Sequence, residues 1–195
     1  MQFFAARQPI LDKNKNLYAY ELLFRDSDSN AFPDIDGDEA TQKMVTHSNH
    51  INFSKVTENK PAFINFTMGT LVKGYPKLLN KADVVIEILE SVKPCDELLS
   101  LCRELHNEGY TIALDDYEHQ DIWKPFYPYI DIIKIDVQQS TLNDIGELKT
   151  AIEQFPHIKL LAEKIETQQE FQQVKDLGCE LFQGFLFSPP EMVMG

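Results

Sequence analysis

Seven polar residues stand at the ends of successive short apolar segments of the chain. After a longer first interval they recur every ~20–30 residues, about the length of one strand–helix unit of a barrel. Carboxylates and amides supply the oxygen ligands that hard cations such as Mg²⁺ and Mn²⁺ prefer, so the set is suited to a shared metal site. The seven residues are Glu21, Asn65, Glu87, Asp115, Lys134, Glu163 and Gln183.

The types of these residues favour the hydrolysis of a phosphate ester. Two cations ~3.5–4 Å apart clamp a phosphodiester and lower the pKa of a bridging water. Asp116 offers a ligand for a second ion, and either Glu163 or Asp136 would complete the metal shell. Lys134 would orient the water or stabilise charge in the transition state. Arg25 would hold the substrate, because arginine binds phosphate through two parallel hydrogen bonds.

Taken singly, each residue also has a plain structural explanation. A lone glutamate at a strand end is more often a solvated rim residue than a ligand. Lys134 would be an ion-pair partner, Asn65 a turn residue, and Asp115-Asp116 the start of a helix, where the helix dipole favours acids. The joint occurrence of these residue types at strand ends favours the shared site. A metal-dependent barrel enzyme that acts on sugar phosphates remains an alternative.

The apolar segments that carry these residues are predicted to be buried parallel strands. Such strands read as continuous apolar runs, because helices cover both faces of their sheet. Helical spacing follows several of them, as in the series Leu98, Leu101, Cys102 and Leu105. This alternation predicts right-handed βαβ crossovers, and it places the carboxyl ends of the strands at one rim, where barrel enzymes carry their catalytic groups.

The first two strands are predicted to differ from the rest. Turn residues at 12–16 separate strand 7–11 from strand 17–24, which predicts an antiparallel hairpin. Pro189-Pro190 would open a linker, and we predict one α/β domain over residues 1–195. The further predicted strands are 62–66, 84–89, 111–115, 130–135, 157–162 and 181–182, and the predicted helices are 38–51, 69–73, 95–109, 142–154 and 167–178.

The composition excludes several classes of protein. A formal net charge of −13 argues against binding to nucleic acid polymers, whose phosphates need a basic surface. No apolar run approaches the ~20 residues that span a bilayer, so no membrane partner is expected. Three scattered cysteines fit reduced thiols rather than a disulfide framework. We therefore expect a cytoplasmic protein.

Several short segments also match the motifs of a known family in order. They are Glu21-Leu22-Leu23-Phe24-Arg25, Ile64-Asn65-Phe66, Glu87-Ile88-Leu89-Glu90, Leu114-Asp115-Asp116, Ile133-Lys134-Ile135-Asp136, Ala162-Glu163-Lys164-Ile165-Glu166-Thr167 and Phe182-Gln183-Gly184-Phe185-Leu186-Phe187. The chain resembles the EAL domain, the cyclic di-GMP phosphodiesterase family, and most closely the EAL half of EAL–HDOD proteins. The resemblance implies a modified TIM barrel with an antiparallel first strand, and a C-terminal HDOD domain beyond residue 195.

The resemblance also implies an activity, the hydrolysis of cyclic di-GMP to linear pGpG with one or two Mg²⁺ or Mn²⁺ ions. Lys134 would position the nucleophilic water, acting with the catalytic carboxylates Glu21 and Glu163. Glu90 would steady the loop after the aspartate pair. The residues implied to contact substrate are Gln8, Arg25 and Gln183, and the implied metal ligands are Glu21, Asn65, Glu87, Asp115, Asp116 and Glu163.

Two departures from the family pattern leave alternatives open. The aspartate pair is followed by Tyr117-Glu118-His119-Gln120, where the family has Phe-Gly and a further glycine. Lys164 replaces the usual glycine beside Glu163, and would either repel a metal or pair with a neighbouring carboxylate. A phosphodiesterase, a slow one included, and a catalytically silent module that binds cyclic di-GMP or a protein partner both remain open, as does a homodimer formed through the loop.

Overall fold

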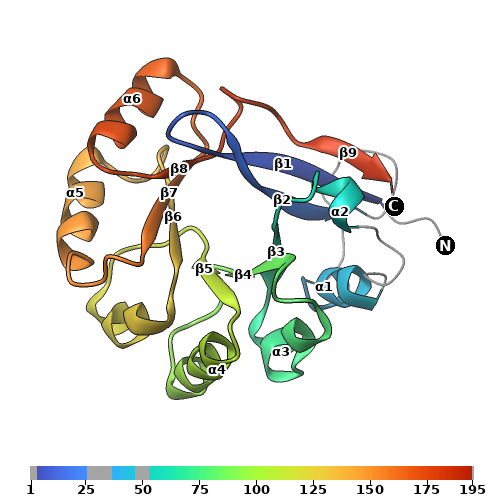
Figure 1. Cartoon of the computed structure of the whole chain (residues 1–195). Helices are drawn as coiled ribbons and strands as arrows, with labels where there is room; N and C mark the ends of the chain where they lie inside the picture. The colour runs from blue at the N-terminus through green and yellow to red at the C-terminus, as the bar shows by residue number, and fades with distance from the viewer. Residues whose placement is uncertain (1–3, 26–36, 47–52, 195) are drawn as a thin grey trace.

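The computed structural model describes residues 4–25, 37–46 and 53–194, and its central element is a closed barrel (Figure 1). Eight strands close it in the order β2-β3-β4-β5-β6-β7-β8-β1, with β1 pairing back to β2. Their bounds are β1 Phe4–Asp12, β2 Leu17–Arg25, β3 Ala62–Phe66, β4 Val84–Ile88, β5 Thr111–Leu114, β6 Ile132–Asp136, β7 Lys159–Glu163 and β8 Leu181–Phe182.

The strand β1 runs antiparallel to both of its barrel neighbours, β2 and β8, whereas β2 through β8 are parallel. The hairpin turns where the sequence predicts it, because Asp12 Oδ1 accepts hydrogen bonds from the backbone N–H groups of Asn14 and Asn16, and Lys15 takes a left-handed conformation with φ 62°. The predicted TIM-type barrel with an antiparallel first strand is confirmed.

Helices lie around the outside of the barrel (Figure 1). Three of them begin at threonines that form reciprocal capping boxes, Thr67, Thr141 and Thr167. The α-helices are α1 Gly37–Thr46, α2 Phe53–Val56, α3 Met68–Val72, α4 Asp96–Asn107, α5 Leu142–Ala151 and α6 Gln168–Asp176, and the 3₁₀ helices are η1 Tyr75–Leu78 and η2 Asp121–Tyr129. Residues 47–51 of the predicted helix 38–51 lie outside the described residues. In the part of the chain that is described, no helix is both long and apolar enough to cross a membrane.

The predicted linker at Pro189-Pro190 is wrong for the residues that follow it directly. A ninth strand, β9 (Glu191–Met194), pairs antiparallel with Phe4–Arg7 of β1. Its pairing partner lies at the other end of the chain. No local pattern marks four residues after two prolines as a strand.

One apolar layer fills the inside of the barrel and supports the site above it. It consists of Ile10, Ala19, Phe63, Val85, Ala113, Ile132, Leu161 and Leu181. Side chains alternate between the two faces of a strand, so the residue two positions further along each parallel strand faces the same interior. On each of the seven parallel strands, the residue two positions after the member of this layer is one of the seven polar residues identified from the sequence. On the antiparallel β1 the equivalent position is two residues earlier, at Gln8.

Candidate active site

The polar residues form the next layer of the barrel interior, at the carboxyl ends of the parallel strands. Asn65 and Asp115 are half-buried, and the other five are buried: Lys134 is 1% exposed, Glu87 0% and Gln183 2%. Buried charged groups persist only when they are paired or bound to a metal. The layer is therefore a built site and not a solvated edge.

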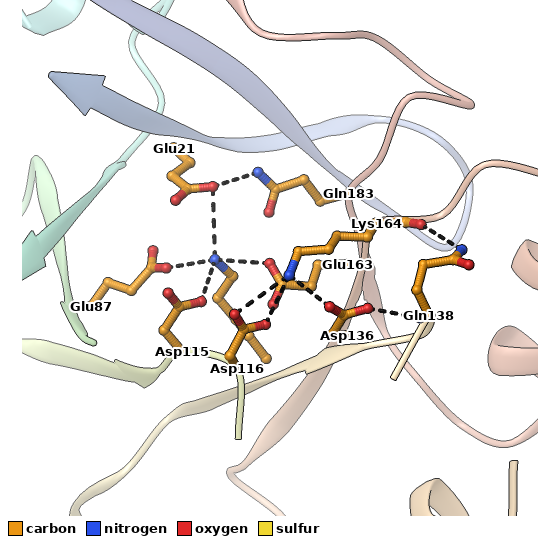
Figure 2. A network of polar contacts seen from close by, with 10 residues as sticks. Glu21, Glu87, Asp115, Asp116, Asp136, Gln138, Glu163, Lys164 and Gln183 are labelled. Atoms are coloured by element: carbon orange, nitrogen blue, oxygen red, sulfur yellow. Dashed lines mark hydrogen bonds and ion pairs between the residues drawn. The ribbon is translucent and has the colours of Figure 1, made fainter. Parts of the chain in front are cut away.

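Four carboxylates, which Figure 2 labels as Glu21, Glu87, Asp115 and Glu163, surround the ammonium group of Lys134. Its Nζ lies 2.5 Å from Glu87 Oε1, 3.0 Å from Asp115 Oδ1, 3.3 Å from Glu163 Oε2 and 3.7 Å from Glu21 Oε2. These residues come from β2, β4, β6 and β7 and from the position after β5, so barrel closure alone brings them together. We call these four carboxylates the carboxylate ring.

The ring holds more negative charge than one lysine balances. Burial raises the pKa of Glu87 well above its usual value against the opposing effect of Lys134, and Glu21 and Asp115 add to the rise. Burial also raises the pKa of Glu163 well above its usual value. At Asp115, burial is outweighed by Lys134 and by hydrogen bonds, so its pKa is lowered. Burial disfavours the charged form of Lys134, but the surrounding carboxylates raise its pKa well above the usual value.

Two glutamines extend the ring toward the N-terminal hairpin. Gln183 Nε2 donates to Glu21 Oε2 at 2.6 Å and to Gln8 Oε1 at 3.1 Å. Gln8 Nε2 in turn donates to the backbone carbonyl of Ser188 at 3.1 Å. These bonds orient Glu21 and connect the segment after β8 to the site. The side chain of Arg25, the third residue predicted to contact substrate, lies outside the described residues.

The oxygen atoms of the site fit a divalent cation. Among the described residues, four buried side-chain oxygens have no hydrogen-bond partner, and all belong to this layer: Asn65 Oδ1, Glu87 Oε2, Glu163 Oε1 and Gln183 Oε1. Buried polar atoms are nearly always paired, so unpaired acceptors beside acids indicate a missing donor or cation. Carboxylate and amide oxygens are the ligands of Mg²⁺ and Mn²⁺.

A second acidic group shares Asp115 with the ring and lies at the mouth of the barrel. The carboxylates of Glu90, Asp115 and Asp116 offer oxygens within 4.8 Å of one another. Glu90 is predicted to steady the loop after the aspartates, and the structure places it beside both of them. The spacing in the sequence does not show that Glu90 lies close to the two aspartates, because Glu90 follows a different strand.

The ring and this acidic group open into a cleft of about 640 Å³. Its apolar walls include Leu23, Leu89, Phe185 and Pro190, and the Phe185 side chain is 66% exposed. Sequence reasoning missed these wall residues, since an apolar residue near a strand end carries no local sign of facing a cleft. The cleft thus combines a charged floor with apolar sides.

A family model for the EAL domain matches residues 39–190. The cyclic di-GMP phosphodiesterase CdgJ of Vibrio cholerae is 38% identical over 97% of this chain and 45% of its own length. The chain belongs to the EAL domain family. The Bacillus subtilis protein YuxH is also 38% identical, over 100% of this chain and 49% of its own length. The chain therefore spans about half the length of the curated relatives it matches.

Solved structures agree with this EAL domain in fold. BlrP1 of Klebsiella pneumoniae, solved as a complex with manganese and cyclic di-GMP, aligns with a TM-score of 0.76 at 22% identity, over 98% of this chain and 57% of that chain. An EAL domain protein of Listeria monocytogenes aligns with a TM-score of 0.70 at 16% identity, over 96% of this chain and 88% of that chain.

The loop after Asp116 replaces the glycines typical of EAL domains with a network of aromatic residues. Tyr117 is buried, and its hydroxyl lies 2.6 Å from that of Tyr127 and 3.3 Å from His119 Nδ1. None of residues 117–120, all of them described, has a positive φ; the left-handed position falls on Asp116 itself, with φ 38°. Asp116 tolerates this conformation better than most residues do, which is how the loop turns without glycine.

Lys164 pairs with neighbouring carboxylates, which is one of the two alternatives that the sequence left open. Its Nζ lies 2.6 Å from Asp136 Oδ2 and 3.3 and 3.4 Å from the two oxygens of Asp116 (Figure 2). Asp136, predicted as an alternative ligand, is thus the ion-pair partner of a lysine. Gln138 supports it, because its backbone N–H donates to Asp136 Oδ1 and its amide donates to the Lys164 carbonyl. No local pattern marks Gln138 as part of the site.

Proposed function

We propose that this EAL domain hydrolyses cyclic di-GMP to linear pGpG with Mg²⁺ or Mn²⁺. The observation that carries the proposal is the buried carboxylate ring around Lys134, with unpaired oxygens beside it. A structural ion-pair network normally provides a donor for each of its buried acceptors. The names of CdgJ and of the BlrP1 complex agree with this substrate.

The ring residues would hold the cation through their oxygens. The proposed ligands are the ring residues Glu21, Glu87, Asp115 and Glu163 with Asn65 beside them, and Asp116 is the proposed ligand of any second ion. A divalent ion bound there would supply Lewis acidity, which lowers the pKa of a water and polarises a phosphate oxygen. Lys134 supplies the positive charge that holds the acids close together, and its N–H groups are placed to orient a water or a phosphate oxygen. Glu90 would steady the loop that follows Asp115 and Asp116.

The cleft walls fit a cyclic dinucleotide. Phosphates would lie on the charged floor, where Gln8, Gln183 and Arg25 are the proposed contacts. Flat guanine bases would pack against the apolar sides, where Phe185 and Leu89 offer exposed surface, since bases stack on aromatic side chains.

The alternative function is a catalytically silent module that binds cyclic di-GMP or a protein partner. The specific observation in its favour is that the ammonium group of Lys164 forms an ion pair with the carboxylate of Asp116, a proposed metal ligand. Of the remaining proposals, one domain over residues 1–195 and a cytoplasmic location rest on length and composition. A C-terminal HDOD domain and a homodimer rest on the sequence resemblance.

The deciding experiment incubates the chain with cyclic di-GMP and Mn²⁺ or Mg²⁺ and follows linear pGpG by chromatography. We expect turnover that EDTA abolishes and that Glu21→Gln removes. Tight binding of cyclic di-GMP without product in either metal would establish the silent module. Absence of both binding and turnover would leave only interaction with a protein partner.

A further inference from the structure

Lys164 occupies the side of the site where a second cation would bind. It follows the last residue of β7, and its side chain reaches Asp136 at the end of β6 and Asp116 beyond the end of β5; Figure 2 labels the three residues. Asp116 belongs to the second acidic group, with Glu90 and Asp115. The ammonium group of Lys164 and any ion bound by these three carboxylates would have to share the carboxylate of Asp116.

The contacts of Lys164 resemble those of a bound ion. Both oxygens of Asp116 lie at almost the same distance from Nζ, 3.3 and 3.4 Å, and Asp136, only 5% exposed, provides a third oxygen at 2.6 Å. Glu163 lies against Asp116, and its Oε1 is buried without a partner. Oxygens from three neighbouring strands therefore converge on this position.

Backbone geometry gives no reason for a lysine here. Lys164 has a φ of 58°, in the left-handed region. A side chain with a Cβ adopts that region at a cost which glycine avoids. The ion pairs with Asp116 and Asp136 are the contacts that a glycine would lose, so they are what the lysine adds to the site.

We propose that the Lys164 ammonium group stands in for a second divalent cation at Asp116, so that this chain binds a single metal ion, in the carboxylate ring. The inference rests on the proposed function, since it concerns the number of ions at that site. Lys164 balances one negative charge of the Asp116 and Asp136 pair without a metal. Nζ already lies 3.3 Å from Asp116 Oδ1, so a divalent ion bound to the same carboxylate would be repelled by the ammonium group and would have to displace it.

The test counts Mn²⁺ ions per chain by calorimetry, and independently by electron paramagnetic resonance of free Mn²⁺. The wild-type chain should bind one ion. Lys164→Met removes the charge and keeps the length, and Lys164→Gly also relaxes the backbone. Each should bind two ions, the second at least tenfold tighter than any second ion on the wild type. Lys164→Arg keeps the charge and should still bind one.

Lys77→Met is the matched control, because Lys77 pairs with Glu104 and Glu108 on the outer surface. It should leave the count at one. Circular dichroism establishes that each variant is folded. Two ions on the wild type, or one ion on both Lys164→Met and Lys164→Gly, would overturn the inference and leave the proposed function standing. No Mn²⁺ on any variant would overturn the metal site itself, and the proposed function with it.

Discussion

Replacing Lys134 by methionine removes the positive charge at the centre of the carboxylate ring and keeps a side chain of similar length. Three carboxylates lie within 3.3 Å of its Nζ, and the lysine is 1% exposed, so solvent does not compensate the loss. Breaking a buried ion pair by removing one partner costs about 3–5 kcal/mol. Since 1 kcal/mol shifts Tm by about 2–4 °C in a domain of this size, we expect the metal-free variant to melt roughly 6–20 °C below the wild type at pH 8.

The size of this loss should depend on pH. Burial already raises the folded-state pKa of Glu87 well above 4.5, and Lys134 opposes the rise, so its removal raises that pKa further. A group with a raised folded pKa contributes stability below its unfolded value and loses that contribution as the pH rises through the folded value. Below the folded-state pKa of Glu87 both proteins carry it protonated, so the destabilisation of Lys134→Met should grow only as the pH rises from that raised wild-type pKa toward the still higher pKa in the variant.

Thermal unfolding followed by circular dichroism, in EDTA and in Mn²⁺, measures both effects. Mn²⁺ should raise the Tm of Lys134→Met more than that of the wild type, because the ion replaces part of the lost charge. Lys77→Met removes an equal charge from an exposed position and should change Tm little. If Lys134→Met melts within a degree or two of the wild type at pH 8 in EDTA, the ring is not held by the lysine and the electrostatic reasoning is wrong.

Three further predictions address the ring and the loop. Glu21→Gln should lower turnover at least about 100-fold, because loss of a direct ligand costs more than the ~10–100-fold typical of groups that only support a ligand. The circular dichroism spectrum should stay unchanged. A variant with the wild-type rate would show that Glu21 is not a ligand. Mn²⁺ binding should release protons and weaken as the pH falls, because burial raises the pKa of Glu87 and Glu163. Calorimetry in two buffers of different ionisation enthalpy checks this. Equal binding heats in the two buffers would contradict the release of protons. Tyr117→Phe removes the 2.6 Å hydroxyl contact with Tyr127 and should cost about 1 kcal/mol, or about 2–4 °C in Tm; an unchanged Tm would show that the loop does not depend on this bond.

The features that the sequence determined are the local ones. Strand β3 falls on the predicted residues 62–66, because a short apolar run ended by a polar residue is a property of neighbouring positions. The hairpin turn at Asp12 depends on hydrogen bonds that span at most four residues. The period of two along a strand then decides that Asn65 faces the same side as Phe63, whatever the rest of the fold does.

The tertiary structure decided which of these local features meet. Lys134 bonds to Glu87 across 47 residues of sequence, and Lys164 reaches Asp136 across 28 and Asp116 across 48. None of these three spacings carries a periodic signal, because the partners depend on which strands become neighbours when the barrel closes. The same reason explains β9 and the position of Glu90 beside the aspartates. The sequence therefore determined the types and facing of the polar residues, and barrel closure decided that two lysines would be their counterions.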